Sequence, residues 1–236
     1  MHQDWPAVRA TTAVWQHERI SRESGRPKLA DSLAALTPYC RGQIIYDESA
    51  PVECWYRVLS GAARRFVVRA DGRRQIIDLL LSGDVFGFGA RGSHAFTADA
   101  ISNGTVIARY PRSRLENLAA SDPRVAHEVQ EMALEESRRL QYLILILGRT
   151  TAQEKVGAFL LHLTRRLASQ PTDRVTLPIS RYDIADYLAL SVETVSRALT
   201  GLKRSGVIAL AGPRQLRIVD RGAIEIEDEY SPLSVA

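Results

Sequence analysis

The chain has 236 residues, a length that suits two compact domains better than one small module. Its 31 lysines and arginines against 27 acidic residues give a net charge of +4, which permits an anionic partner without requiring one. Two cysteines exclude a disulfide-held scaffold. The longest apolar stretch, 142–147, is far below the ~20 residues of a membrane helix, and the N-terminus has no signal-peptide core. We expect a soluble cytoplasmic protein with no membrane partner.

Residues 1–37 carry scattered arginines without an apolar period, which predicts a loose N-terminal arm with a short helix around 14–20. Between 38 and 120 the character changes, because short apolar or alternating runs recur between closely spaced glycines. This spacing is typical of an all-β sandwich or barrel. Asp71-Gly72, between the runs at 65–68 and 75–79, is a strong hairpin signal.

Residues 121–148 are expected to form a long helix. Ser121, Asp122 and Pro123 favour a helix start, and apolar residues then recur at spacings of four and three. Because 143–147 is apolar all round, we expect the helix to pack on its own domain and on the same helix of a second copy. The alternative is a single buried central helix. The expected dimer interface comprises Val125, Val129, Met132, Leu140, Leu143, Ile144 and Leu147.

The segment 149–222 is predicted to be a second domain, followed by a tail at 223–236. Thr151 with Glu154, and Ser180 with Asp183, are spaced as helix-opening capping boxes. Ser191 can cap a third helix that ends near Gly206, and β-type runs follow at 207–210 and 215–219. Two helices, a turn, a third helix and a hairpin in that order indicate a winged helix-turn-helix.

The third helix of this domain carries the most informative pattern. Its polar face presents Glu193, Ser196 and Arg197 within the first two turns, where a helix-turn-helix reaches base edges. Arg197 can donate to both guanine O6 and N7, and Glu193 can accept from cytosine N4. The alternative is an ordinary solvated helix face. The residues expected on the buried face are Val192, Val195, Leu199 and Leu202.

Phosphate contacts are expected from side chains around the same helix and from the loop that joins the two last strands. Arg214 lies at the tip of this predicted wing, where a backbone or minor-groove contact is expected. For each residue the alternative is a surface group that only adds solubility. The candidate phosphate contacts are Arg181, Ser191, Thr194, Thr200, Lys203, Arg204 and Arg214.

Several segments of the chain resemble the cyclic-AMP-receptor/FNR superfamily of bacterial transcription regulators, and the resemblance covers about residues 40–220. The segments are 56–61, 71–73, 82–87, 183–188 and 191–197. The resemblance implies an α+β fold: an N-terminal β-roll of the jelly-roll (double-stranded β-helix) type, a long dimerisation helix and a C-terminal winged helix. It also implies a homodimer that binds double-stranded DNA at palindromic promoter sites and commonly recruits RNA polymerase. The spacing of Glu193, Ser196 and Arg197 is similar to that of the FNR and FixK branches. This implies TTGA/TCAA-type half-sites, with Val192 near a thymine methyl.

Departures from the family pattern bear on the effector. The iron–sulfur sensors of the family carry an N-terminal cysteine cluster, whereas residues 1–39 have no cysteine, and Cys40 with Cys54 cannot hold a four-iron cluster alone. The cyclic-nucleotide binders carry an acidic residue after a glycine and an adjacent Arg-Ser pair. After Gly87 this chain has only Arg91 and Ser93 nearby.

We therefore expect a FixK-like regulator, and an activator, that needs no bound effector, cofactor or metal. The alternative is a ligand-gated regulator that senses a cyclic nucleotide or haem in the β-roll, where His94 and the arm residue His17 leave haem open. A cupin-like metal enzyme is a remote alternative, because its site needs several converging histidines and only His94 lies in the roll. Cys40 and Cys54 are expected to be inert rather than redox switches, and the loop at 69–73 is a candidate polymerase contact by family analogy.

Overall fold

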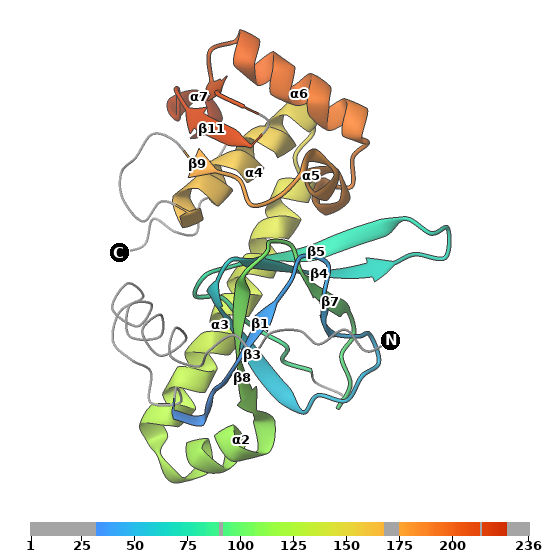
Figure 1. Ribbon diagram of the computed structural model, residues 1–236. Helices are drawn as coiled ribbons and strands as arrows, with labels where there is room; N and C mark the ends of the chain where they lie inside the picture. Colours follow the sequence, from blue (N-terminus) through green and yellow to red (C-terminus); the bar gives the residue numbers. More distant parts are fainter. Residues whose placement is uncertain (1–31, 90–91, 168–174, 213, 226–236) are drawn as a thin grey trace.

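The computed structural model describes residues 32–89, 92–167, 175–212 and 214–225, and its N-terminal half is a β-roll (Figure 1). Two four-stranded antiparallel sheets, ordered β1-β8-β3-β6 and β2-β7-β4-β5, enclose a core that includes Val58, Phe86, Ala100 and Ile107. The expected roll is thereby confirmed. Its strands are β1 (Ala35–Tyr39), β2 (Ile44–Tyr46), β3 (Cys54–Ser60), β4 (Ala62–Val68), β5 (Arg74–Leu81), β6 (Val85–Phe86), β7 (Thr97–Ala100) and β8 (Thr105–Pro111).

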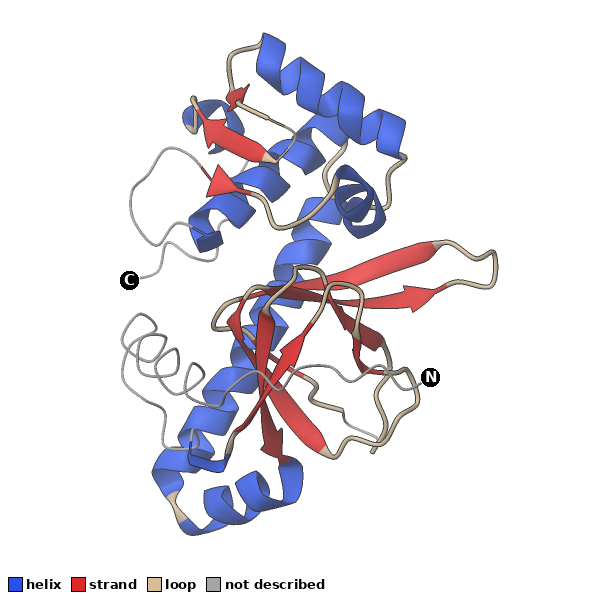
Figure 2. Cartoon of the chain, in the orientation of Figure 1, coloured by secondary structure: helices blue, strands red, loops and turns tan. Residues whose placement is uncertain are grey.

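Strands β4 and β5 form the hairpin predicted at Asp71-Gly72. Gly72 has a φ of +80°, a left-handed conformation that favours glycine, and its N–H donates to the carbonyl of Arg69 at 2.9 Å. The Asp71 carboxylate accepts from the backbone N–H of Arg73 at 3.0 Å, which closes the turn. This long hairpin projects from the roll on the side of the C-terminal domain (Figure 2).

The roll is followed by two helices, α2 (Arg112–Ser121) and α3 (Pro123–Leu147), of which only the second was expected. Asp122 is the N-cap of α3, and its carboxylate accepts from the backbone N–H of Arg124 at 2.9 Å. The predicted start at 121 is therefore slightly early, because Ser121 still belongs to α2. The prediction of β-roll structure up to 120 missed α2, which has a single buried residue, Leu115, and hence no apolar period.

The C-terminal domain has the predicted winged helix-turn-helix order. Ser180 and Asp183 form a full capping box, and the Thr151 hydroxyl accepts from the backbone N–H of Glu154 at 3.2 Å. Strand β9, which sequence analysis did not anticipate, adds a third strand to the wing. The elements are α4 (Ala152–Leu167), β9 (Val175–Thr176), α5 (Arg181–Leu188), α6 (Val192–Arg204), β10 (Ile208–Leu210), β11 (Gln215–Ile218) and α7 (Gly222–Glu225).

One continuous apolar cluster joins the roll to the C-terminal domain. Ile76 and Leu79 of β5 belong to the same buried cluster as Ile146 of α3, Phe159 of α4 and Leu188 of α5. Burial of this area supplies the main favourable term that holds the two domains together. In the described part of the chain, no helix has the length and apolar character needed to cross a membrane.

Two terminal segments differ from the predicted boundaries. Strand β1 begins at Ala35, inside the predicted arm, because Ala35 pairs with Arg109 of β8 in the first sheet. At the other end, the predicted tail begins within α7. The short helix expected around 14–20 lies outside the described residues.

Candidate DNA-binding interface

Helix α6 is fixed in the domain by its N-cap and by one buried face. The Ser191 hydroxyl accepts from the backbone N–H of Thr194 at 3.1 Å. Val195, Leu199 and Leu202 are each at most 5% exposed, as predicted. Val192, expected on the same face, is only half-buried, so its side chain remains partly accessible at the edge of the helix.

The opposite face of α6 carries the predicted base-contacting residues. Glu193 and Arg197 are exposed and Ser196 is half-buried, and α6 lies at the outer edge of the molecule, away from the roll (Figure 1). The pKa of Glu193 lies below its ordinary value because its own backbone N–H and the Ser191 side chain donate to the carboxylate, with Arg197 adding attraction. Glu193 is therefore ionised at neutral pH and can only accept hydrogen bonds.

The candidate phosphate contacts surround this face. Arg181, the first residue of α5, is exposed, and its guanidinium donates to the Ser196 hydroxyl at 3.4 Å, which links the two helices. Lys203 and Arg204 are exposed in the last turn of α6. Arg214 is exposed just before β11, while its carbonyl accepts from the backbone N–H of Leu177 at 2.8 Å and ties the wing to β9.

The remaining candidates on α6 are hydroxyl groups already engaged locally. Ser191 is exposed and caps the helix, and its hydroxyl lies 3.0 Å from that of half-buried Thr194. Thr200 is exposed, and its hydroxyl donates to the carbonyl of Ser196 at 2.9 Å. A phosphate oxygen can only accept, so each hydroxyl would have to turn its O–H toward the phosphate to contact it, and it offers no charge.

Tyr182 is a surface residue that sequence analysis missed. It follows Arg181 in the first turn of α5 and is 68% exposed, which is unusual for a large aromatic side chain. Its phenol can donate to a phosphate oxygen. Its place two residues after the Ser180 N-cap, off the apolar face of α5, was the available signal in the sequence.

The predicted dimer interface on α3 is divided between two faces. Val125 is 1%, Met132 2% and Leu143 8% exposed, and Val125 packs with core residues of the roll. Ile144, by contrast, is 69% exposed. Val129, Leu140 and Leu147 are half-buried, and Leu134 and Leu145, which were not predicted, are exposed. An apolar stripe thus remains on α3 after the chain has packed its own core.

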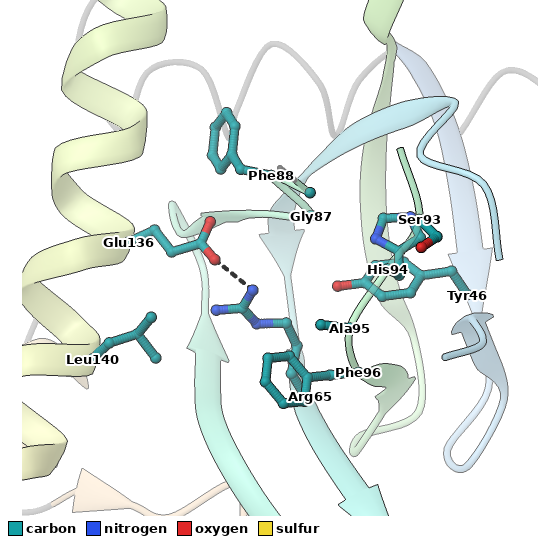
Figure 3. Close-up of a pocket in the computed structure, with 11 residues that line it drawn as sticks. Tyr46, Arg65, Gly87, Phe88, Ser93, His94, Ala95, Phe96, Glu136 and Leu140 are labelled. Carbon is teal, nitrogen blue, oxygen red and sulfur yellow. Dashed lines mark ion pairs between the residues drawn. The ribbon is translucent and has the colours of Figure 1, made fainter. Parts of the chain in front are cut away.

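A cavity of about 400 Å³ lies between the roll and α3 (Figure 3), and it bears on the alternative of a ligand bound in the roll. Tyr46, Phe88 and His94 of the roll line it, together with Glu136 and Leu140 of α3. The His94 ring stacks on Tyr46 with centroids 3.7 Å apart, and burial lowers the pKa of His94. His94 is therefore neutral at pH 7 and packed among aromatic rings.

The guanidinium of Arg65 is the one cation among the described residues that line this cavity. It forms an ion pair with Glu136 across the cavity, drawn in Figure 3, and a second with Asp78 at 2.9 Å. Asp78 is also within 3.3 Å of Arg139 on α3. Although burial opposes its charge, Arg139 and Arg65 keep the pKa of Asp78 below its ordinary value.

These pairings leave little to hold a nucleotide phosphate. The carboxylate of Glu136 sits where an anion would approach Arg65, and both partners of Arg65 are buried acids. Arg91, the other arginine considered, lies outside the described residues. No group of three metal-ligating side chains gathers within the described ranges, and Cys40 and Cys54 are free thiols.

The fold and the exposed face of α6 define a class, a winged-helix DNA-binding protein with an N-terminal β-roll. Two family models match the chain, the cyclic nucleotide-binding domain over residues 36–122 and the Crp-like helix-turn-helix domain over 154–225. The chain belongs to the cyclic-AMP-receptor/FNR family of transcription regulators, in its FixK-like branch. Members of this family are regulators and not enzymes, which removes the cupin-like alternative.

Individual relatives support this assignment. The chain is 43% identical over 209 residues to the nitrogen fixation regulation protein FixK of Azorhizobium caulinodans, covering 86% of this chain and 83% of that protein. It is 34% identical over 192 residues to the transcriptional activatory protein AadR of Rhodopseudomonas palustris, covering 80% of each. The solved structure of FixK2 from Bradyrhizobium japonicum is 41% identical, with a TM-score of 0.76, covering 82% of this chain and 96% of that one.

Proposed function

We propose that this DNA-binding regulator recognises TTGA/TCAA-type palindromes as a homodimer and does so without a bound effector. The observation that carries the proposal is the outer face of α6, where Glu193 and Arg197 are exposed while Val195 and Leu199 anchor the helix. Within the described residues, neither Glu193 nor Arg197 forms a salt bridge. The Glu193 carboxylate already accepts from Ser191 and from its own backbone N–H, but its remaining lone pairs can accept from a base edge. An α-helix with such a face fits the major groove.

Within a half-site, each side chain has a distinct role. Arg197 donates to guanine O6 and N7, and the ionised Glu193 accepts from cytosine N4. Ser196 can contact either edge, and the half-buried Val192 contacts a thymine methyl at the rim of the helix. Arg181, Lys203, Arg204 and Arg214 bind phosphates, with Ser191, Thr194 and Thr200 as weaker hydroxyl contacts, and these determine affinity more than sequence preference.

The homodimer forms through the apolar stripe of α3. Ile144, with half-buried Val129, Leu140 and Leu147, can pack on the same residues of a second copy, extended by Leu134 and Leu145. Val125, Met132 and Leu143, also proposed for this interface, already pack inside the chain and can contribute only by supporting α3. Replacing Ile144 by Glu should convert the dimer to monomer in sedimentation velocity, whereas the same change at Asn117, which is exposed on α2 and outside the apolar stripe, should not.

Independence from an effector rests on the buried charges beside the cavity. Arg65 is already neutralised by Glu136 and Asp78, so a phosphate would have to displace a carboxylate held by buried ion pairs. Among the described residues that line the cavity, no other cation is present to bind the charge of a cyclic nucleotide.

The outcome of binding is proposed from relatives. The protein AadR is named a transcriptional activatory protein, and an activating role with recruitment of RNA polymerase in the cytoplasm follows by analogy.

Selection of bound duplexes from a random pool by the purified, effector-free protein tests the proposal. We expect the recovered sites to contain TTGA and TCAA half-sites as a palindrome, and the same selection with Arg197→Ala to lose the preference at one position of each half-site. Recovery of non-palindromic sites, or of no enriched sequence, would refute it.

A second candidate function, a ligand-gated regulator, is favoured by one observation. Three buried polar atoms around the cavity, Arg65 Nε, His94 Nε2 and Glu136 Oε2, have no hydrogen-bond partner among the described residues. A ligand with both donors and acceptors could satisfy them. A Soret band in the visible spectrum, or a rise in melting temperature with a cyclic nucleotide, would establish this alternative in place of effector independence.

A further inference from the structure

The C-terminal domain rests on the β4–β5 hairpin of the roll through polar contacts as well as apolar ones. In Figure 1 the hairpin passes beneath α5, and α5 contacts β5. Arg74 Nε donates to the Asp186 carboxylate at 2.8 Å, and a second nitrogen of Arg74 lies 3.3 Å from Asp183. Gln75 donates to the carbonyl of Asp186 at 2.7 Å, which satisfies one of the free carbonyls at the end of α5.

Arg64 reinforces this contact from within the roll. Its guanidinium is held by Asp99 on β7 through two hydrogen bonds of 2.7 Å, and it also forms an ion pair with Asp183. The side chains of Arg64 and Asp183 are 12% and 8% exposed, so solvent screens this pair far less than a surface pair. The roll therefore presents a pre-oriented cation to the first helix of the helix-turn-helix.

Asp183 serves both domains at once. One oxygen accepts from the backbone N–H and hydroxyl of Ser180 at 2.9 and 2.7 Å, which caps α5. The other oxygen faces Arg64 and Arg74. Because the same carboxylate fixes the helix start and the interdomain ion pairs, α5 cannot rotate on the roll without breaking charged hydrogen bonds.

We propose that Arg64 and Arg74 are positioning residues for DNA recognition. They hold Asp183 and Asp186, fix the angle of the helix-turn-helix on the roll, and thereby set the separation of the two α6 helices in the dimer. The proposal rests on the proposed function, since two helices must enter successive major grooves about 34 Å apart. A small rotation of α5 relative to α3 would displace both recognition helices from that separation.

The test titrates the intact protein with DNA duplexes in the absence of RNA polymerase. Arg74→Gln removes the interdomain ion pairs of Arg74 but leaves the capping residue Asp183 and the whole of α6 in place. The matched control is Arg73→Gln, because Arg73 is the preceding residue and its ion pair is with Asp71 of its own turn, at 2.7 Å, with side chains 77% and 47% exposed. Each protein is titrated with the selected palindrome, with palindromes whose half-sites are moved one base pair closer or further apart, and with a single half-site.

We expect Arg74→Gln to bind the selected palindrome about three- to tenfold more weakly than Arg73→Gln does, a range suited to a partly exposed ion pair. Its preference for the original spacing over the altered spacings should shrink, while its half-site affinity and melting temperature stay those of the control. Asp186→Asn should reproduce this pattern, and combining it with Arg74→Gln should weaken binding little further, since both remove the same interaction.

Two results would overturn the proposal. One is an unchanged spacing preference in Arg74→Gln, and the other is an equal weakening on half-site and palindrome with a lower melting temperature, which indicates a purely structural role. Failure of the proposed function would give another result: the unaltered protein itself would then prefer no palindrome at any spacing.

Discussion

The outer face of α6 and the cluster between the roll and α3 both combine arginines with carboxylates, yet they differ in where the charges find partners. Arg197 and Glu193 face solvent on α6. Arg65, Asp78 and Glu136 are at most 8% exposed and pair with one another. The number of arginines in a region therefore does not locate an anion site. The exposed guanidinium of α6 remains available to DNA, whereas the buried ones already hold the fold together.

The largest expected effect comes from breaking the buried cluster. Asp78→Asn removes the carboxylate shared by Arg65 and Arg139, and it leaves buried guanidinium charge uncompensated. We expect the free energy of unfolding, measured by urea titration, to fall by about 3–5 kcal/mol. The control is Asp71→Asn on the exposed hairpin turn, which should leave the urea midpoint unchanged. A midpoint in Asp78→Asn equal to the unaltered protein's would show that the cluster does not hold the fold.

The next effect concerns α6. Arg197→Ala should weaken binding to the selected palindrome by about 1–3 kcal/mol per half-site and relax discrimination at one base pair of that half-site. Competition titrations against duplexes substituted at each position measure both quantities. The control is Arg124→Ala, an arginine at the start of α3 that is paired locally with Asp122 at 2.8 Å. An Arg197→Ala protein with an unchanged footprint and unchanged specificity would contradict the assignment of α6.

A smaller and less specific effect is expected at the wing. Arg214 is exposed and is assigned to a phosphate, so Arg214→Ala should weaken binding to all duplexes about equally. The slope of log affinity against log salt should become shallower by about one for each phosphate that the variant no longer neutralises. A sequence-dependent weakening in the same titrations would place Arg214 at a base edge instead.

The smallest expected effect is a pH dependence of stability. Because the pKa of Asp78 in the folded state lies below its ordinary value, the unfolded chain binds more protons through this group. The contribution of Asp78 to stability is therefore present at pH values above the ordinary aspartate pKa of about 3.9. It is lost as the pH falls through the pKa of Asp78 in the folded state. Urea midpoints should drop more steeply below about pH 4 in the unaltered protein than in Asp78→Asn. Parallel curves for the two proteins would contradict this linkage.

Local features of the sequence were sufficient to predict α6 and the β4–β5 hairpin. The Ser191 cap, the apolar spacing of Val195, Leu199 and Leu202, and the turn at Asp71-Gly72 each depend on residues close in the chain. The exposed polar face followed from the same helical period. Helix α2 could not be predicted in this way, because one buried leucine leaves no pattern.

The charged contacts between elements were beyond sequence analysis for a different reason. Arg139 and Asp78 are 61 residues apart, and Arg64 and Asp183 are 119 apart, so no local period links them. The same holds for α3, where apolar spacing identified the helix but not which apolar residues face its own roll. Val125 and Ile144 are both apolar, and only the folded chain shows that one is buried and the other exposed.

We propose above that two copies of the effector-free chain present α6 to both halves of a palindrome. The most direct test is a titration of the purified, nucleotide-free protein with the TTGA/TCAA palindrome, a single half-site and a scrambled duplex over a range of salt concentrations. We predict strongest binding to the palindrome, in a complex of two chains, with affinity that falls steeply as salt rises. Equal affinity for the palindrome and the scrambled duplex, or binding only after a cyclic nucleotide is added, would contradict effector-free recognition of a palindrome by α6.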